Sequence, residues 1–207
     1  QNIHAMKMDC AVMRHPVPGS CLQLSKFVDA VVINAGDGTH EHPTQALLDM
    51  MSIKEKFGKI KGIKVGIVGD ILHSRVALSN IFGLVTMGAN VKVCGPPHLI
   101  PRNIEDLGIK KTYDVNELIE WADAINVLRI QSERMGVGII PSIREYRDCF
   151  GITNERLNKY KKDIVIMHPG PINRGVELDS AIADSDQAII LDQVLNGVAV
   201  RMSILYL

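Results

Sequence analysis

The stretch NAGDGTHEHPTQALLDMM, residues 34–51, joins the end of one apolar run to the start of another. It predicts the end of a β-strand over residues 31–34 (VVIN), then a sharp turn that contains glycine, then a helix. Pro43 suits the first turn of a helix, where no amide hydrogen is needed, and an apolar stripe continues to Phe57 before Gly58 ends it. This order of strand, turn and helix is the building unit of an α/β fold.

Strand and helix patterns alternate along the rest of the chain. Before the opening stretch, CAVMRH predicts a strand and GSCLQLSKFVDA predicts a helix. After it, KVGIVGD, NVKVCGP, DAINVLR and DIVIMHPGP predict buried strands, and helical patterns lie between them. Continuous apolar strands separated by helices are typical of a doubly wound parallel sheet that is covered on both faces. We therefore expect the α/β class.

Three segments are expected from these patterns. Residues 1–50 are typical of the back half of one α/β domain, and residues 51–188 predict a complete one. Residues 189–207 predict a C-terminal helix that returns to the first domain, with a break at Asn196 and Gly197. Because the chain opens at Gln1 with a strand pattern already under way, we expect a fragment or a processed chain, with removal of a tag as the alternative.

Composition narrows the class of protein. The 207 residues are 46% hydrophobic, and 23 Lys and Arg balance 23 Asp and Glu. A zero formal charge argues against a general nucleic-acid binder, and the apolar runs are too short for a membrane span. The four cysteines lie far apart, which favours reduced thiols in a cytoplasmic protein. We expect no nucleic acid, membrane, cofactor or metal as a partner.

Polar residues gather where the predicted strands end. They are Arg14, then His42 with Gln45, then Arg75 after VGIVG, then Arg129 with Gln131 after INVL, then HPGPINR (residues 168–174) after IVIM. Because the carboxyl ends of parallel strands meet at one edge of a sheet, we expect these side chains to face one ligand site.

Each of these residues alone has a plainer interpretation. A lone histidine such as His42 more often caps a helix or packs locally, a lone arginine is more often structural, and Gln131 could be an ordinary exposed glutamine. Three arginines that follow buried strands are different, because guanidinium forks there suit carboxylate or phosphate. His42 and Gln45 lie three positions apart and share one helix face, where they could bind a carbonyl oxygen and an amide.

Other motifs are excluded or ambiguous. VGIVGD lacks the G-x-G-x-x-G spacing of a dinucleotide site, and His73 in the segment that follows is interpreted as a packing or surface residue. His40 and His42 are too few ligands for zinc. In HPGP, prolines lack amide hydrogens, so the carbonyl oxygens of Pro169 and Gly170 could accept hydrogen bonds from a ligand amine, although a simple tight turn explains the motif equally.

Taken together, the motifs resemble the aspartate carbamoyltransferases. The matching stretches are VMRH, NAGDGTHEHPTQALLD, VGDILHSRV, LRIQSERM, PSIREY, MHPGPINRGVE and NGVAVRM, in family order over essentially the whole chain. HPTQ is shared across carbamoyltransferases, whereas LRIQSER with MHPGPINR marks the aspartate branch.

The resemblance implies a role for each candidate residue. Arg14 would contact the phosphate and carbonyl oxygen of carbamoyl phosphate, His42 would donate to that oxygen, and Gln45 would hold the carbamoyl NH2. Arg75 would bind the α-carboxylate of L-aspartate, and Arg129, supported by Gln131, its β-carboxylate. The carbonyls of Pro169 and Gly170 would face the carbamoyl NH2 and the incoming amine. No metal is needed for this chemistry.

The sequence departs from the family pattern in one respect. The Ser-Thr-Arg-Thr phosphate loop of the family has no counterpart here, nor does the loop that supplies a serine and a lysine to the neighbouring subunit. We therefore expect the C-terminal portion of such an enzyme, with negligible activity alone. The resemblance also implies a homotrimer and a regulatory or dihydroorotase partner. A non-catalytic scaffold subunit and a carbamoyltransferase for another amino acid stay open as alternatives.

Overall fold

The computed structural model describes residues 5–130, 142–160 and 163–207. Its strands are β1 (Cys10–His15), β2 (Val31–Asp37), β3 (Lys64–Val68), β4 (Asn90–Cys94), β5 (Lys110–Thr112), β6 (Ala124–Val127) and β7 (Val165–Met167). Its α-helices are α2 (Ser20–Ser25), α3 (Pro43–Phe57), α4 (Arg75–Thr86), α5 (Val115–Trp121), α6 (Ile143–Phe150), α7 (Asn154–Tyr160), α8 (Ser180–Ala183) and α9 (Ile190–Tyr206). Two 3-10 helices, η1 (Pro97–Leu99) and η2 (Ile104–Leu107), lie between β4 and β5.

The larger sheet is parallel throughout. Over the described residues it has five strands in the order β5-β4-β3-β6-β7. The chain moves outward from β3 to β5 and then returns to β6 on the other side of β3, so the order reverses between β3 and β6. In sheets of this kind, ligands bind beyond the carboxyl ends of the strands at such a reversal. The predicted α/β class with a doubly wound parallel sheet is confirmed.

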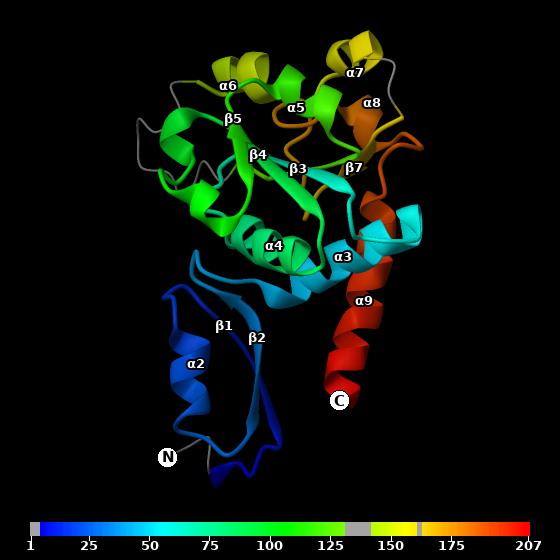
Figure 1. Cartoon of the computed structure of the whole chain (residues 1–207). Coiled ribbons are helices and arrows are strands. Elements are labelled where there is room, and N and C mark those ends of the chain that lie inside the picture. The colour runs from blue at the N-terminus through cyan, green and yellow to red at the C-terminus, as the bar shows by residue number, and fades with distance from the viewer. Residues whose placement is uncertain (1–4, 131–141, 161–162) are drawn as a thin grey trace.

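Helices cover both faces of this sheet (Figure 1). Val65 and Ile67 of β3 point to one face and pack in a core with Ile53 of α3 and Ile81 of α4. Val68 points to the other face and joins a second core built on α5, α7 and α8. The near-continuous apolar strands of the sequence are thus explained, because their residues are buried on both sides.

A smaller unit precedes this sheet. β1 and β2 pair in parallel, and α2 lies beside them, below the larger sheet in Figure 1. α3 leads from this unit to the larger one, and α9 runs alongside α3. Asn196 of α9 donates from Nδ2 to Ser52 Oγ at 2.9 Å and to Glu55 Oε2 at 2.7 Å, which joins the C-terminal helix to α3.

The predicted break at Asn196 and Gly197 is wrong, because α9 continues without interruption from Ile190 to Tyr206. Gly197 is buried, and a Cβ atom there would lie 3.2 Å from Cδ2 of Leu48. The glycine therefore lets α9 approach α3 closely, and its cost in helix propensity is offset by this packing.

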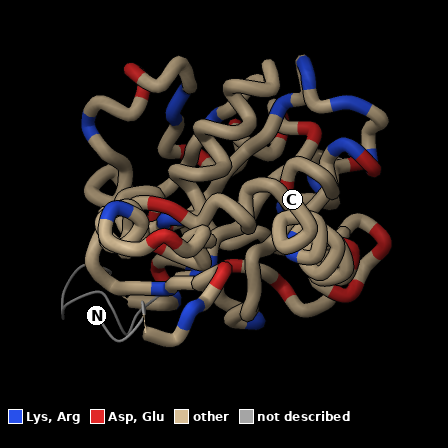
Figure 2. Tube along the Cα trace, turned by 90° about the horizontal axis from the view of Figure 1, so that it is seen from below, with Lys and Arg blue, Asp and Glu red and all other residues tan. Residues whose placement is uncertain are grey.

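The distribution of charged residues and the state of the cysteines agree with what the composition predicts. Basic and acidic positions are interspersed along the chain trace (Figure 2). Cys10, Cys21, Cys94 and Cys149 are free cysteines, as their spacing predicts. Within the described part of the chain, no helix is both long enough and apolar enough for a membrane crossing.

Candidate functional site

A cavity of about 340 Å³ lies at the carboxyl ends of the strands. Its walls come from β1, from the segments that follow β2, β3, β6 and β7, and from α9. We call it the basic cavity, and it is lined by Arg14, His42, Gln45, His73, Ser74, Arg75, Val76, Leu128, Arg129, Pro169, Gly170, Pro171 and Arg201. Seven of the eight residues singled out from the sequence therefore share one cavity. The eighth, Gln131, lies outside the described residues.

Arg14 reaches the basic cavity beside an irregularity in the smaller sheet. Met13 pairs with Asn34 and His15 pairs with Asp37, so β2 has one more residue than β1 between the two pairs. A bulge of this kind bends the strand and changes the direction of nearby side chains. Arg14 is exposed on the cavity wall, where its guanidinium group can meet an anion.

His42 occupies the position just before α3 but does not cap it. No side-chain capping bond is present, and its backbone N–H donates to Ser79 Oγ at 2.9 Å. The interpretation of His42 as a helix cap is therefore wrong. Its Nδ1 atom is buried and has no hydrogen-bond partner within the described residues.

The electrostatic environment keeps the imidazole of His42 neutral. Burial first, and then three nearby guanidinium groups, lower the pKa of His42 to about 4. These groups belong to Arg75, Arg14 and Arg201. A neutral imidazole has one N–H donor, so at physiological pH it can donate a hydrogen bond to a carbonyl oxygen without adding charge.

Gln45 presents its amide in a fixed orientation. The side chain is buried, and Nε2 donates to Asp49 Oδ1 at 3.0 Å, one turn further along α3. Because this bond turns the nitrogen toward Asp49, the carbonyl Oε1 atom is the acceptor that the amide can offer to a ligand, beside its second N–H. On the wall of the basic cavity, such an oxygen suits an N–H donor of a ligand.

Arg75 is the first residue of α4, after Ser74, whose Oγ caps the helix by accepting from Ala77 N at 3.2 Å. Its Nη1 atom donates to the carbonyl of Gly38 at 3.3 Å. The guanidinium plane also lies against Gly36, where a Cβ atom would be 3.0 Å from Arg75 Cζ. Gly36 also has a φ of 131°, which residues with a side chain rarely adopt. Glycine is therefore favoured here both by the backbone conformation and by the closeness of Arg75.

The loop after β7 has few backbone N–H groups left for a ligand. The backbone N–H of His168 donates to Gln193 Oε1 at 2.9 Å, and the N–H of Gly170 donates to His168 Nδ1 at 2.8 Å. Pro169 and Pro171 have no amide hydrogen, and the peptide bond between Gly170 and Pro171 is cis. The backbone groups that this loop has left for the basic cavity are therefore acceptors rather than donors. Arg129 lines the same cavity from the segment after β6.

Two ionisable residues of the cavity wall were missed from the sequence. Arg201 comes from α9, four residues after Gly197 and hence on the same helix face; this spacing within NGVAVRM was the available signal. His73 was interpreted as a packing or surface residue, but it lines the cavity, and its Nδ1 atom lies 3.0 Å from both carboxylate oxygens of Asp70.

The charge of the basic cavity limits its chemistry. Four arginines and no carboxylate belong to its described lining, which favours ligands with several negative charges. Among the residues with assigned positions, no group of three or more His, Cys, Asp or Glu side chains could hold a metal ion. The arrangement can bind anions, donate to a carbonyl oxygen and accept from an amine.

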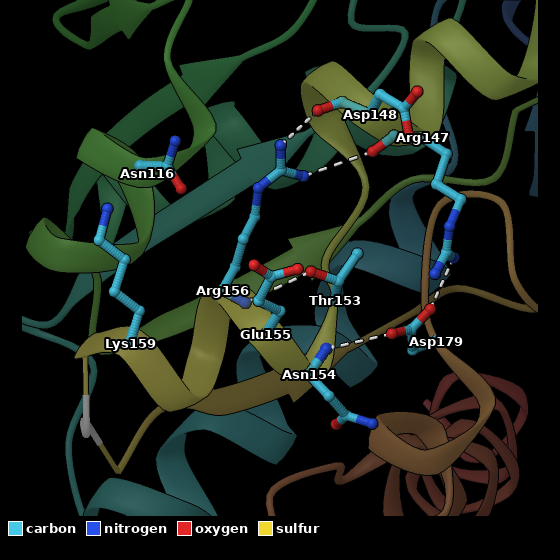
Figure 3. Close-up of a pocket in the computed structure, with 9 residues that line it drawn as sticks. All are labelled: Asn116, Arg147, Asp148, Thr153, Asn154, Glu155, Arg156, Lys159 and Asp179. Atoms are coloured by element: carbon cyan, nitrogen blue, oxygen red, sulfur yellow. Dashed lines mark hydrogen bonds and ion pairs between the residues drawn. The ribbon is translucent and has the colours of Figure 1, made fainter.

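A larger cavity of about 760 Å³ lies elsewhere, beside α5, α6 and α7 (Figure 3). We call it the balanced cavity, and it is lined by Asn116, Arg147, Asp148, Thr153, Asn154, Glu155, Arg156, Lys159 and Asp179. Arg147 Nη1 lies 2.6 Å from Asp179 Oδ1, and Arg156 donates to the backbone carbonyls of Arg147 and Asp148 (Figure 3). These pairings hold loops together, and they make this cavity a poor anion site despite its size.

Two family models match the chain. The model described as "Aspartate/ornithine carbamoyltransferase, carbamoyl-P binding domain" matches residues 1–55. The model described as "Aspartate/ornithine carbamoyltransferase, Asp/Orn binding domain" matches residues 61–207. The second match alone covers more than half of the chain.

Curated relatives agree with the models. The aspartate carbamoyltransferase catalytic subunit of Christiangramia forsetii is 62% identical over 206 residues, which are 100% of this chain and 66% of that protein. The catalytic subunit of Flavobacterium johnsoniae is 59% identical over 100% of this chain and 67% of its own length. The chain thus spans about two thirds of the relatives that it matches.

Solved structures have the same fold. Aspartate transcarbamoylase of Trypanosoma cruzi in complex with N-(phosphonacetyl)-L-aspartic acid (PALA) superposes with a TM-score of 0.85 at 28% identity, over 99% of this chain and 67% of that one. The catalytic subunit of the M. jannaschii enzyme gives 0.78 at 36% identity, over 95% and 65%. The chain belongs to the aspartate/ornithine carbamoyltransferase family.

Proposed function

We propose that this protein transfers the carbamoyl group of carbamoyl phosphate to the amine of L-aspartate, giving N-carbamoyl-L-aspartate and phosphate for pyrimidine biosynthesis. The observation that carries the proposal is the basic cavity, where arginines, a neutral imidazole and an amide oxygen meet without a carboxylate in the described lining. Carbamoyl phosphate and aspartate are both anions, and together they match this excess of positive charge. The curated relatives, named as aspartate carbamoyltransferase catalytic subunits, support the choice of aspartate.

The carbamoyl end of the site would consist of Arg14, His42 and Gln45. Arg14 would contact the phosphate and the carbonyl oxygen, and His42 would donate its N–H to the same oxygen. The amide oxygen of Gln45, whose nitrogen is held by Asp49, would accept from the carbamoyl NH2. These roles use the polar groups that each side chain has available in the cavity.

The aspartate end would consist of Arg75 and Arg129, with Gln131 as support. Arg75 would bind the α-carboxylate and Arg129 the β-carboxylate, because a guanidinium fork matches a carboxylate in two hydrogen bonds. The carbonyls of Pro169 and Gly170 would receive the N–H groups of the carbamoyl amide and of the incoming amine. The role of Gln131 rests on the sequence alone.

The reaction then follows from this placement. The neutral amine of aspartate attacks the carbamoyl carbon, the C–O bond to phosphate breaks, and we propose that the departing phosphate takes the amine proton. Charge that builds on the carbonyl oxygen is stabilised by Arg14 and His42, and each such donor contributes roughly 3 kcal/mol. Holding the two anions together can lower the barrier by about 7–11 kcal/mol more.

Assembly and location belong to the same proposal. We propose residues 1–50 as part of a carbamoyl phosphate domain, residues 51–188 as the aspartate domain, and residues 189–207 as a helix that returns to the first domain, where Gln193 donates to Asp49. The family-model boundaries and the bonds from α9 to α3 support this division. A cytoplasmic homotrimer with a regulatory or dihydroorotase partner is the assembly that we propose.

Two alternatives make different predictions. A non-catalytic scaffold would bind PALA weakly or not at all and would show no turnover, and it would have no use for this set of cavity side chains. A carbamoyltransferase for another amino acid would use L-ornithine or a related amine. The presence of both Arg75 and Arg129 on the cavity wall favours a dicarboxylic amino acid, because the two guanidinium groups would repel an amino acid with a cationic side chain.

The decisive experiment is a steady-state assay of the complete protein with carbamoyl phosphate and either L-aspartate or L-ornithine. We expect turnover with aspartate alone. The Arg129→Ala variant should raise the KM for aspartate by roughly 30-fold or more, with a much smaller change for carbamoyl phosphate. Equal effects on the KM values of both substrates would contradict the assignment of Arg129. Turnover with L-ornithine would contradict the proposal that L-aspartate is the substrate.

A further inference from the structure

Asp49 is a fully buried carboxylate at the centre of α3, close to the basic cavity but outside its lining. Its Oδ1 atom accepts from Gln45 Nε2 at 3.0 Å and from Gln193 Nε2 at 2.7 Å. Its Oδ2 atom accepts from Asn80 Nδ2 at 2.7 Å and from Asn126 Nδ2 at 3.1 Å. Amides from α3, α9, α4 and β6 thus converge on one carboxylate.

An ionised carboxylate can only accept hydrogen bonds, so each amide must turn its nitrogen toward Asp49. The orientation is imposed even where it leaves other atoms unsatisfied. The Oδ1 atoms of Asn80 and Asn126 are buried and have no hydrogen-bond partner in the described part of the chain. Burial raises the pKa of Asp49 to about 6 against the opposing effect of these four donors, so the carboxylate is ionised at physiological pH.

Two of these amides connect Asp49 with the basic cavity. Gln45 lines the cavity, and its bond to Asp49 fixes which end of the amide is nitrogen and which is the accepting oxygen. Gln193, whose nitrogen is also engaged, accepts through Oε1 from the backbone N–H of His168 at 2.9 Å. His168 begins the loop that contains Pro169 and Gly170, on another wall of the cavity.

We propose that Asp49 is a positioning residue that makes the site select a ligand with an NH2 group, by fixing Gln45 as an acceptor and by holding the acceptor loop through Gln193. The inference rests on the proposed function, because it concerns the carbamoyl NH2. It predicts discrimination between carbamoyl phosphate and acetyl phosphate, which has a methyl group where carbamoyl phosphate has NH2.

The Asp49→Asn variant is the direct test, because it keeps the shape but replaces one acceptor oxygen by a donor. A donor at the Oδ1 position allows the amides of Gln45 and Gln193 to turn, and Gln45 then offers an N–H to the carbamoyl NH2. The dissociation constants of carbamoyl phosphate and acetyl phosphate are measured with the complete protein by competition against PALA. We expect the preference for carbamoyl phosphate to fall by about ten-fold or more, with acetyl phosphate little affected.

The control is Asn126→Ala, which removes a donor from Oδ2 and leaves the Oδ1 side intact. It should lower thermal stability but leave the preference between the two phosphates unchanged. A purely structural Asp49 would weaken both ligands in parallel in Asp49→Asn, and that result, or an unchanged preference, would overturn the proposal. Failure of the unsubstituted protein to bind carbamoyl phosphate would instead count against the proposed function.

A second variant keeps the proposal testable if Asp49→Asn does not fold. Gln193→Met separates Asp49 from the loop but leaves the bond between Asp49 and Gln45. We expect a several-fold increase in the KM for aspartate, because the loop acceptors lose their support, together with a fall in the preference for carbamoyl phosphate that is smaller than in Asp49→Asn, because Gln45 keeps its orientation. An unchanged KM would contradict the link through Gln193.

Discussion

The basic cavity and the balanced cavity differ most in how their charges are arranged. The balanced cavity has about 760 Å³ of space and three basic side chains matched by three acidic ones in its described lining. The basic cavity has about 340 Å³, with four arginines and no acidic side chain among its described residues. The smaller space is the better candidate site, because a wall with four arginines and no acidic side chain in its described lining attracts anionic ligands, whereas basic and acidic side chains in equal number offset one another.

The same residue type therefore has opposite uses in one molecule. Arg156 in the balanced cavity donates to backbone carbonyls of residues that end or follow α6, and so acts as an internal brace. Arg14 in the basic cavity is exposed beside a bulge of the smaller sheet, where a ligand can reach it. Substitutions can separate these two uses if enzymatic activity and thermal stability are measured independently for each variant.

The largest effect is expected for Arg14→Ala. Loss of the guanidinium group that we propose to stabilise the charge on the carbonyl oxygen should lower kcat by about 100- to 1,000-fold, while the unfolding temperature stays nearly constant. Steady-state kinetics and thermal unfolding of the complete protein measure the two quantities. Arg14→Lys is the matched control, since it keeps the charge but not the fork, and it should recover only part of the activity. A near-normal kcat in Arg14→Ala would remove this residue from the site.

A smaller effect is expected for Gly36→Ala, which tests the placement of Arg75. The new methyl group would lie 3.0 Å from Arg75 Cζ, so the guanidinium group must move. We expect the KM for aspartate to rise by roughly ten-fold, because a displaced fork loses part of its carboxylate contact. The KM for carbamoyl phosphate should change much less.

Gly62→Ala is the control for backbone strain. Gly62 also has a positive φ, 81°, but nothing lies within 4 Å of a Cβ atom there. Both variants should lose about 1–3 kcal/mol of stability, while only Gly36→Ala should affect aspartate binding. Equal kinetic effects in the two variants would show that strain, not the contact with Arg75, is responsible.

Arg156→Ala tests the other side of the comparison. Removal of this side chain takes one donor away from the carbonyls of Asp148 and Gly151 and one of two donors from the carbonyl of Arg147, which also accepts from Gly151 N, so the free energy of unfolding should fall by roughly 1–3 kcal/mol. Turnover and PALA affinity should remain within a factor of about two, because the balanced cavity takes no part in the proposed reaction. A large loss of activity without a loss of stability would mean that the balanced cavity has a function of its own.

The sequence predicts the parallel sheet and the meeting of strand ends because both follow from local patterns. Apolar runs identify the strands, and parallel pairing then places Arg75 and Arg129 at one edge of the larger sheet and Arg14 and His42 at the corresponding end of the smaller one. β5, only three residues long and with two lysines, gave no such pattern and was not predicted. Its pairing with β4 depends on the neighbouring strand rather than on its own sequence.

The remaining features depend on contacts between distant segments. Gly197 looked like a helix break because its packing partner, Leu48, lies on another helix. Gln193 and Asp49 are 144 positions apart, and Asn126 is 77 positions from Asp49, so the amide cluster has no local signature. Arg201 has a local signal in its spacing from Gly197, but only the docking of α9 shows that this helix face reaches the cavity.

The smallest predicted effect concerns pH and returns to the basic cavity. The pKa of His42 in the folded protein is about 4, below its ordinary value of 6.5, because burial and the neighbouring arginines disfavour the imidazolium form. As pH falls from 6.5 toward 4, the unfolded chain binds a proton at this position that the folded chain does not, so the contribution of His42 to stability decreases. Below about pH 4 both states are protonated and the loss stops growing.

His42→Gln isolates this contribution, because other titrating groups, Asp49 included, remain the same in both proteins. We expect the difference in unfolding free energy between the unsubstituted protein and the variant to shift by about 1 kcal/mol against the unsubstituted protein between pH 7.5 and pH 5, allowing for the part of the ring that water reaches. Urea unfolding at the two pH values measures it. If the difference did not change with pH, neither burial nor the neighbouring arginines would lower the pKa of His42 in the folded state, and the neutral imidazole that we assign to the basic cavity would be wrong.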